Sequence, residues 1–169
     1  MSLPQLRIAI ITLSMRVSKG ERQDAGGDAL AARLQKEKMH IVDRIVLPDD
    51  KAALIQKLKN ISDNESADLV LTTGGTGMSP TDVTPEATLA VLEKRLTGFE
   101  VAMLQQGLQQ TPHAMLSRAV AGTRARTIII NLPGNPKGAV ENLEAIIHTL
   151  PHAVRVLQAK QVEDQEHRY

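Results

Sequence analysis

Residues 72–87 read TTGGTGMSPTDVTPEA, and this stretch decides the fold of the chain. An apolar run, Asp68–Leu71, precedes it, and a helical pattern, Pro85–Leu96, follows it. We therefore predict a strand that leads into a glycine loop and then into a helix. Thr84 is the expected N-cap of this helix and Pro85 its first residue, because a proline there loses no hydrogen bond.

The glycine loop has the features of a phosphate site. Gly74, Gly75 and Gly77 let a ligand approach the backbone closely, and the free N–H groups of the helix start form an anion site. Asp82 lies in the same loop. A carboxylate beside an anion site is sensible when a divalent cation bridges it to phosphate, so the loop predicts a phosphate and magnesium site.

Two common phosphate motifs do not fit this loop, and a plain structural turn remains an alternative. No Lys-Ser or Lys-Thr pair follows the glycines, which excludes a Walker A loop. The spacing of the glycines also differs from the G-x-G-x-x-G dinucleotide motif. Glycine and threonine occur in many strand–loop–helix connections only because the turn needs them.

A second loop has the same setting. The run 127–132, TIIINL, is rich in β-branched residues and predicts a strand. The sequence Pro133-Gly134-Asn135-Pro136 then breaks the chain, and a helix is expected from Lys137. PGNP by itself is an ordinary turn, but its place after a strand makes it a second candidate loop.

Strands and helices alternate along the rest of the chain. Strands are expected over Leu6–Leu13, His40–Leu47 and Asp68–Thr72, with a short strand, a turn near Arg124 and a long strand within Val120–Leu132. Helices are expected over Ala25–Lys38, Lys51–Ile61, Pro85–Leu96, Phe99–Gln110 and Lys137–Thr149, with a last helix from Pro151 to about Leu157.

This alternation predicts an α/β fold, a three-layer sandwich whose mostly parallel sheet has helices on both faces. We expect one domain over residues 1–169, with a polar tail from about residue 159. Ligands of such folds bind beyond the carboxyl ends of the strands. The loops there hold Ser14, Asp49, Asp82 and Pro133-Gly134-Asn135, which we expect to converge.

The composition excludes several classes. The chain has 169 residues and a formal net charge of +1, which indicates neither a nucleic-acid partner nor a membrane patch. It has no cysteine, which excludes disulfides and thiolate metal sites. No window reaches the roughly 20 apolar residues of a membrane span, and the first residues lead into a strand, so we expect no signal peptide.

Three motifs together resemble one known family. The GGTG…D-x-TPEA string, the NLPGNP loop and the segment 114–122, AMLSRAVAG, are similar to motifs of the molybdopterin-binding family. That family includes the molybdopterin adenylyltransferases and the G domains of gephyrin and its plant counterpart. The resemblance covers the chain from about Leu6 to Leu157.

The resemblance implies a molybdopterin adenylyltransferase, which transfers AMP from Mg-ATP to the terminal phosphate of molybdopterin in molybdenum cofactor biosynthesis. Asp49 and Asp82 match the catalytic aspartates and would hold the magnesium ion. The residues expected to bind ATP and molybdopterin are Ser14, Gly74, Gly75, Thr76, Gly77, Ser117, Pro133, Gly134, Asn135 and Lys137. The family also implies a cytoplasmic homotrimer that supplies a downstream molybdate-inserting protein.

The chemistry is consistent with these residues. When a phosphate attacks another phosphate the nucleophile is already an anion, so the main obstacle is repulsion between two polyanions. Magnesium held by one or two carboxylates offsets this charge. Loop amides and Lys137 would add positive potential.

Several residues keep a structural alternative. Asp49 or Asp50 is an expected N-cap of the following helix, and Asp82 an expected Asx-turn residue. Ser14 is equally a loop hydroxyl, Lys137 a solvated helix start and Arg118 an ion-pair partner. Glu86 suits the first turn of a helix through its dipole.

Two departures from the family pattern favour an alternative function. Met15 stands in the middle of the family's S-D-R or S-N-R triplet, and Thr81 replaces the arginine of P-R-D. A lost arginine removes a charge-assisted donor beside the phosphate loop. The alternatives are a catalytically weak molybdopterin-binding or carrier protein of the family, and a generic nucleotide-binding α/β domain.

Overall fold

The computed structural model describes residues 5–159 and contains one six-stranded sheet in the order β2-β1-β3-β6-β5-β4. The strands are β1 (Arg7–Leu13), β2 (His40–Leu47), β3 (Leu69–Thr73), β4 (Lys94–Arg95), β5 (Ala121–Arg124) and β6 (Thr127–Leu132). The first four strands in this order are parallel, whereas β5 and β4 are added antiparallel at the edge. The predicted α/β fold with a mostly parallel sheet is confirmed.

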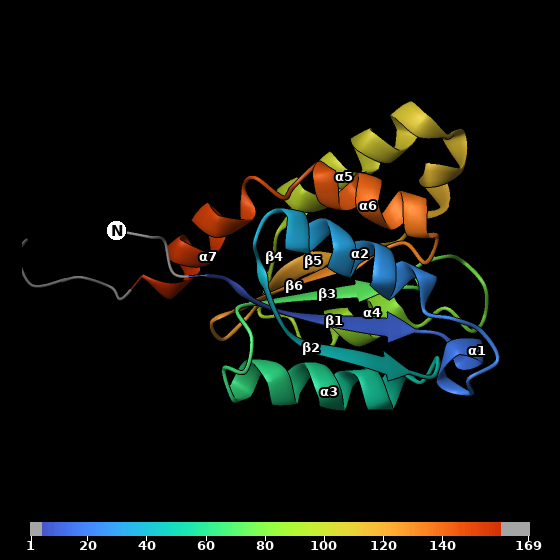
Figure 1. The fold of residues 1–169 in the computed structure, drawn as a ribbon, viewed down its shortest axis with the longest axis horizontal. Helices are drawn as coiled ribbons and strands as arrows, with labels where there is room; N and C mark the ends of the chain where they lie inside the picture. The colour runs from blue at the N-terminus through green and yellow to red at the C-terminus, as the bar shows by residue number, and fades with distance from the viewer. Residues whose placement is uncertain (1–4, 160–169) are drawn as a thin grey trace, which may run out of the picture.

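Helices cover both faces of the sheet (Figure 1). The helices are α1 (Met15–Ser18), α2 (Ala25–Lys36), α3 (Lys51–Asp63), α4 (Thr84–Leu89), α5 (Thr97–Gln110), η1 (Pro112–Leu116), α6 (Pro136–Glu144) and α7 (Leu150–Gln158). Apolar side chains of α2, α5, α6 and α7 pack on one face, and those of α3 and α4 pack on the other. The result is the expected three-layer arrangement.

The central strands are apolar throughout because both of their faces are covered. In β1, Ile8 and Ile10 belong to the core under α2 and α6, whereas Ala9 and Ile11 belong to the core over α3. Successive side chains of a strand point to opposite faces, so one apolar run serves both layers. Because β2, β1, β3 and β6 pair in parallel, their carboxyl ends, and the loops that follow them, lie at one edge of the sheet.

The helix expected over Pro85–Leu96 is wrong in its second half. Helix α4 ends at Leu89, and the chain then turns into the edge strand β4. Glu93 N donates to Thr123 O at 2.8 Å, and Leu96 N donates to Ala121 O at 2.8 Å. Without β4 these carbonyls of β5 would lack backbone partners, and this long-range pairing overrides the local helical pattern.

The helix expected over Lys137–Thr149 is also too long. Helix α6 ends at Glu144, and turns lead into α7, which has Pro151 in its first turn. The amide of Ile146 donates to Leu143 O at 3.1 Å, a three-residue step that tightens the chain. The short helices α1 and η1 were not expected, and the remaining helices and strands agree with the prediction within a few residues. The polar tail expected from about 159 lies, from residue 160, outside the described residues.

In residues 5–159 we find no helix with both the length and the apolar character needed to cross a membrane.

Candidate active site

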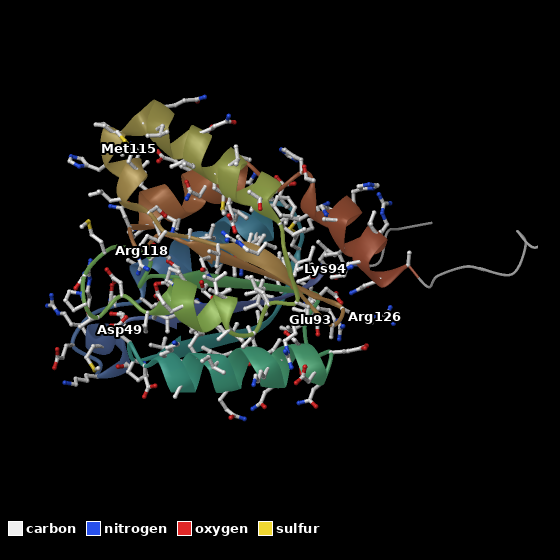
Figure 2. All side chains as sticks on the ribbon, turned by 180° about the vertical axis from the view of Figure 1, so that it is seen from behind. Asp49, Glu93, Lys94, Met115, Arg118 and Arg126 are labelled. Atoms are coloured by element: carbon white, nitrogen blue, oxygen red, sulfur yellow. The ribbon has the colours of Figure 1, made fainter. Side chains whose placement is uncertain are left out.

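The predicted loops meet at the carboxyl edge of the parallel strands. Ser14 N donates to Leu47 O at 3.0 Å and Gly74 N to Leu132 O at 3.2 Å, which joins the ends of β1 and β2 and those of β3 and β6. Figure 2 shows Asp49 at this end of the molecule, with Glu93, Lys94 and Arg126 at the opposite end.

The glycine loop requires glycine at two positions for steric reasons. Gly74 and Gly75 have φ of 96° and 66°, which other residues rarely adopt. A Cβ on Gly74 would lie 2.4 Å from Leu13 O, and one on Gly75 would lie 2.4 Å from Thr84 Oγ1. The loop therefore packs against the end of β1 and the start of α4 with no room for a side chain.

Thr84 does not cap α4, which corrects the sequence prediction. The N-cap position is Val83, and no side chain caps the helix. Thr84 Oγ1 instead donates to Gly74 O at 2.8 Å, and Thr84 N donates to Gly75 O at 3.1 Å. Thr84 is fully buried, so its hydroxyl and amide bind the helix start to the glycine loop.

The two aspartates that follow β2 have separate roles. Asp50 caps α3, because its Oδ1 accepts a hydrogen bond from Ala53 N at 3.0 Å. Asp49 Oδ2 accepts one from Met15 N at 3.0 Å, at the start of α1. Ser14 caps the same helix by accepting from Val17 N at 3.2 Å. Met15 thus holds Asp49 through its backbone, a contact that does not depend on its side chain.

Asp82 forms the turn that the sequence analysis gave as the structural alternative to magnesium binding. Its Oδ2 accepts a hydrogen bond from Ser79 N at 2.9 Å, and its own N–H donates to Ser79 O at 2.9 Å. A Cβ on Gly77 would lie 2.8 Å from the same Oδ2. The carboxylate therefore lies directly against the glycine loop.

Arg118 forms a clamp across the loop from the segment before β5 (Figure 2). Its Nε donates to Gly77 O at 2.7 Å, and one terminal nitrogen donates to Asp82 O at 3.1 Å. It also forms an ion pair with Glu86 in α4. The Arg118 guanidinium holds the pKa of the Glu86 carboxyl below its ordinary value. The ion-pair alternative for Arg118 is therefore correct, and its partner is Glu86.

Two pockets adjoin the glycine loop. One, of about 400 Å³, contains three carboxylates and is called the acidic pocket below. Seven of the predicted site residues line it, namely Ser14, Asp49, Gly74, Gly75, Asp82, Gly134 and Asn135. The other, of about 640 Å³, lies between α5 and α6 and is called the α5–α6 pocket. It includes Thr76, Gly77, Ser117, Pro133, Asn135 and Lys137, so Asn135 lines both pockets.

The third carboxylate of the acidic pocket, Asp24, was missed by the sequence analysis. It caps α2 by accepting from Gly27 N at 3.0 Å, and it accepts from Thr12 Oγ1 at 2.9 Å. Arg44 pairs with it at 3.3 Å. An aspartate just before a helical pattern was the available signal, but it indicates only a cap.

The acidic pocket fits a magnesium ion of the kind that binds with a nucleotide. Among residues 5–159 no cluster of three or more acidic, histidine or cysteine side chains could hold a metal ion alone. Magnesium bound with phosphates needs only one or two carboxylates, since phosphate and water supply the remaining oxygens. In the described part of the chain, no protein group hydrogen-bonds to Asp49 Oδ1 or Asp82 Oδ1, so both oxygens are available.

Asn142 is a second residue that the sequence analysis missed. It lies on α6, lines the α5–α6 pocket and is only 8% exposed. A polar residue at a core-facing helical position was the available signal. Lys137 lies at the rim of the same pocket, largely exposed, with its Nζ 3.7 Å from a carboxylate oxygen of Glu141.

Comparison with known proteins places the chain in a family. Residues 9–152 match the family described as "Probable molybdopterin binding domain". A molybdopterin adenylyltransferase of Haemophilus influenzae is 42% identical over 144 residues, which are 83% of this chain and 73% of that protein. A gephyrin of Dictyostelium discoideum is 37% identical over 162 residues, which are 90% of this chain but only 23% of the gephyrin.

A solved structure agrees with these sequence matches. The molybdopterin biosynthesis enzyme MoaB of Thermus thermophilus superposes with a TM-score of 0.86 at 42% identity, covering 92% of this chain and 98% of that one. The fold, the loop motifs and the matched length agree, and the chain belongs to the molybdopterin-binding domain family.

Proposed function

We propose that this protein is a molybdopterin adenylyltransferase, which transfers AMP from Mg-ATP to the terminal phosphate of molybdopterin. One observation carries the proposal: two pockets meet at the glycine loop and share Asn135, and only one of them holds Asp49 and Asp82. A transfer between two phosphorylated substrates needs two adjoining sites of this kind. The names of the adenylyltransferase relatives agree with this activity.

The acidic pocket is the proposed site of the triphosphate. Glycine-loop amides would bind phosphate oxygens, and Asp49 and Asp82 would hold magnesium, which supplies charge neutralisation of the triphosphate and the pyrophosphate. Loop packing against Leu13 O and Thr84 keeps these amides in place before substrate binds. Such preorganised dipoles lower the barrier because they need no rearrangement during the reaction.

The order of the pockets follows from the geometry of phosphoryl transfer. An oxygen of the molybdopterin phosphate attacks the α-phosphorus of ATP, a new phosphorus–oxygen bond forms, and the bond to pyrophosphate breaks. The attacking and leaving oxygens lie roughly in line, on opposite sides of the phosphorus. With pyrophosphate in the acidic pocket, the molybdopterin phosphate must approach from the α5–α6 pocket.

A catalytically weak binding or carrier protein of the same family is the second candidate. Its support is the pair of departures, Met15 and Thr81. Incubation of the protein with molybdopterin, ATP and magnesium separates the two functions. Formation of adenylylated molybdopterin and pyrophosphate at many turnovers supports the enzyme, whereas tight molybdopterin binding without turnover supports the carrier.

A homotrimer is part of the proposal, as are the cytoplasmic location and the downstream molybdate-inserting partner. Exposed apolar side chains of α5 and η1, namely Val101, Leu104, Leu108, Met115 and Leu116, support self-association. A monomer rarely exposes so many large apolar groups on neighbouring elements. Multi-angle light scattering at several concentrations is expected to give three times the 18.4 kDa chain mass, and a concentration-independent monomer would contradict the assembly.

A further inference from the structure

Asn142 is a buried polar residue whose side chain has no hydrogen-bond partner among the described residues. It is 8% exposed and lies in the wall of the α5–α6 pocket. Its Oδ1 lies 3.7 Å from the place that a Cβ on Gly107 would occupy, so the amide faces α5. The amide nitrogen and oxygen are not sealed from solvent, so they can be reached from the pocket, and a ligand that pairs with both of them would replace water there.

Three other polar side chains of the pocket already hydrogen-bond within the protein. Asn135 Oδ1 accepts from Gly138 N at 3.1 Å, and Thr111 Oγ1 accepts from His113 N at 3.3 Å. The carboxylate of Glu100 binds Arg95 and the amide of Ala121. The side chains of Thr76, Gln110 and His113 have no hydrogen bond among the described residues, but of the two primary amides without one, Asn142 is 8% exposed whereas Gln110 is exposed.

We infer that Asn142 binds the pterin ring of the acceptor substrate in the α5–α6 pocket. A primary amide carries a donor and an acceptor side by side, and it pairs with a heterocycle that offers a neighbouring acceptor and donor. The pyrimidinone edge of a pterin offers these as its ring C=O and ring N–H. Met103 and Leu104 give apolar contact for the ring beside the amide.

The assignment to pterin rather than adenine rests on the proposed function, through the in-line geometry that places the acceptor in this pocket. Adenine also carries a neighbouring donor and acceptor, so binding of adenine is the competing outcome. Asn142 does not react; it would fix the orientation of the ring and so the position of the attached phosphate.

Two substitutions separate lost hydrogen bonds from altered packing. Asn142→Leu keeps the branched shape of the side chain, with somewhat greater volume, and removes both polar groups, whereas Asn142→Ala removes them and leaves space. Asn60→Leu is the matched control, because Asn60 is an exposed asparagine of α3, on the other face of the sheet. Equilibrium dissociation constants for molybdopterin alone and for a nonhydrolysable Mg-ATP analogue are measured, together with Tm.

We expect both Asn142 variants to bind molybdopterin at least tenfold more weakly than wild type, with nucleotide affinity unchanged and Tm near that of wild type. Weaker nucleotide binding instead would assign the amide to adenine and overturn the inference. A lower Tm with unchanged molybdopterin affinity, or weakening by leucine but not by alanine, would also overturn it. If the Asn142 variants bind molybdopterin more weakly but wild type transfers no AMP, the proposed function is refuted and the inference about Asn142 stands.

Discussion

Asp49 and Asp82 each use one carboxylate oxygen for a hydrogen bond within the protein and leave the other available for a ligand. One oxygen of each accepts a backbone N–H, from Met15 and from Ser79 respectively. The other has no hydrogen bond from the described protein and is available to the acidic pocket. A residue of this kind holds its own loop in place and also presents charge, so a structural and a catalytic role are compatible.

Asp82→Asn tests which role dominates, because asparagine keeps the turn and removes the charge. We expect normal folding and molybdopterin binding, with AMP transfer reduced by at least about a hundredfold. The measurement is turnover of molybdopterin at saturating magnesium, with Tm as the check on folding. Asp50→Asn is the control: asparagine caps helices as well as aspartate does, so activity and Tm are both expected to stay near wild type.

Near-normal turnover by a well-folded Asp82→Asn protein would show that the magnesium assignment is wrong. A fall in Tm, with activity following only the folded fraction, would instead make Asp82 a turn residue alone.

Thr81→Arg tests the departure next to Asp82. Thr81 is exposed at the tip of the loop, where its Oγ1 lies 3.2 Å from Ser79 Oγ. A well-placed arginine adds on the order of 1 kcal/mol, so we expect KM for Mg-ATP to fall about fivefold. Thr97→Arg, at an exposed site in α5, controls for added charge. An unchanged KM would mean that another cation, such as Arg16, already serves.

At the scale of elements, the connection from the glycine loop to α4 depends on a residue far away in sequence. Arg118 binds Gly77 O and Asp82 O and pairs with Glu86, so it connects the loop with the start of α4. Arg118 lines neither pocket, and its effect on chemistry would act through the position of Asp82.

Arg118→Met removes this clamp. We expect kcat to fall about tenfold or more, because a small displacement of a catalytic group has large effects on rate, while KM for molybdopterin changes little. Arg124→Met is the matched control: Arg124 pairs with Asp63 and donates to Val91 O, but it lies at the opposite end of the sheet. Steady-state kinetics and Tm are measured for both. Equal losses of kcat in the two variants would assign Arg118 a purely structural role.

At the scale of the whole molecule, Asp68 connects the two ends of the described chain. It binds Arg7 at the start of β1, with Nη2 2.8 Å from Oδ1, and Gln158 at the end of α7, with Nε2 2.8 Å from Oδ1. Burial opposes ionisation of Asp68, but the hydrogen bonds from Arg7 and Gln158 outweigh it and hold the pKa of its carboxyl below the ordinary value.

The sign of this shift predicts a pH dependence of stability. A depressed folded-state pKa stabilises the protein fully above the unfolded pKa of about 3.9, and the stabilisation is lost as pH falls through the folded-state value. We expect Asp68→Asn to lower the free energy of unfolding by about 1–2 kcal/mol at pH 7, since the ion pair is partly exposed. Urea unfolding at pH 7 and at pH 3 measures this.

The difference between wild type and Asp68→Asn is expected to shrink at pH 3, because below a pKa of about 3.9 the carboxyl is mostly protonated in the unfolded chain. A difference that stays constant, or grows, as pH falls would contradict the linkage between Asp68 ionisation and folding.

The sequence by itself determined the features that depend on neighbours in the chain. The β-branched run before PGNP forms β6, Asp50 caps α3, and the glycines after β3 form a loop. The same alternation of elements was sufficient for the three-layer fold, because parallel strands require covered faces and adjacent carboxyl ends. Each of these follows from interactions within a few residues or from general rules of chain connection.

Tertiary structure alone decided the features that depend on distant partners. Helix α4 ends at Leu89 because β5 needs a partner strand, and Thr84 hydrogen-bonds to Gly74 rather than capping its helix. The attachment of Arg118 to Gly77, the separation of the loop residues into two pockets and the free amide of Asn142 likewise arise where elements pack together. A one-dimensional pattern records which side chains are polar, but only packing determines which of them are left with a free donor or acceptor.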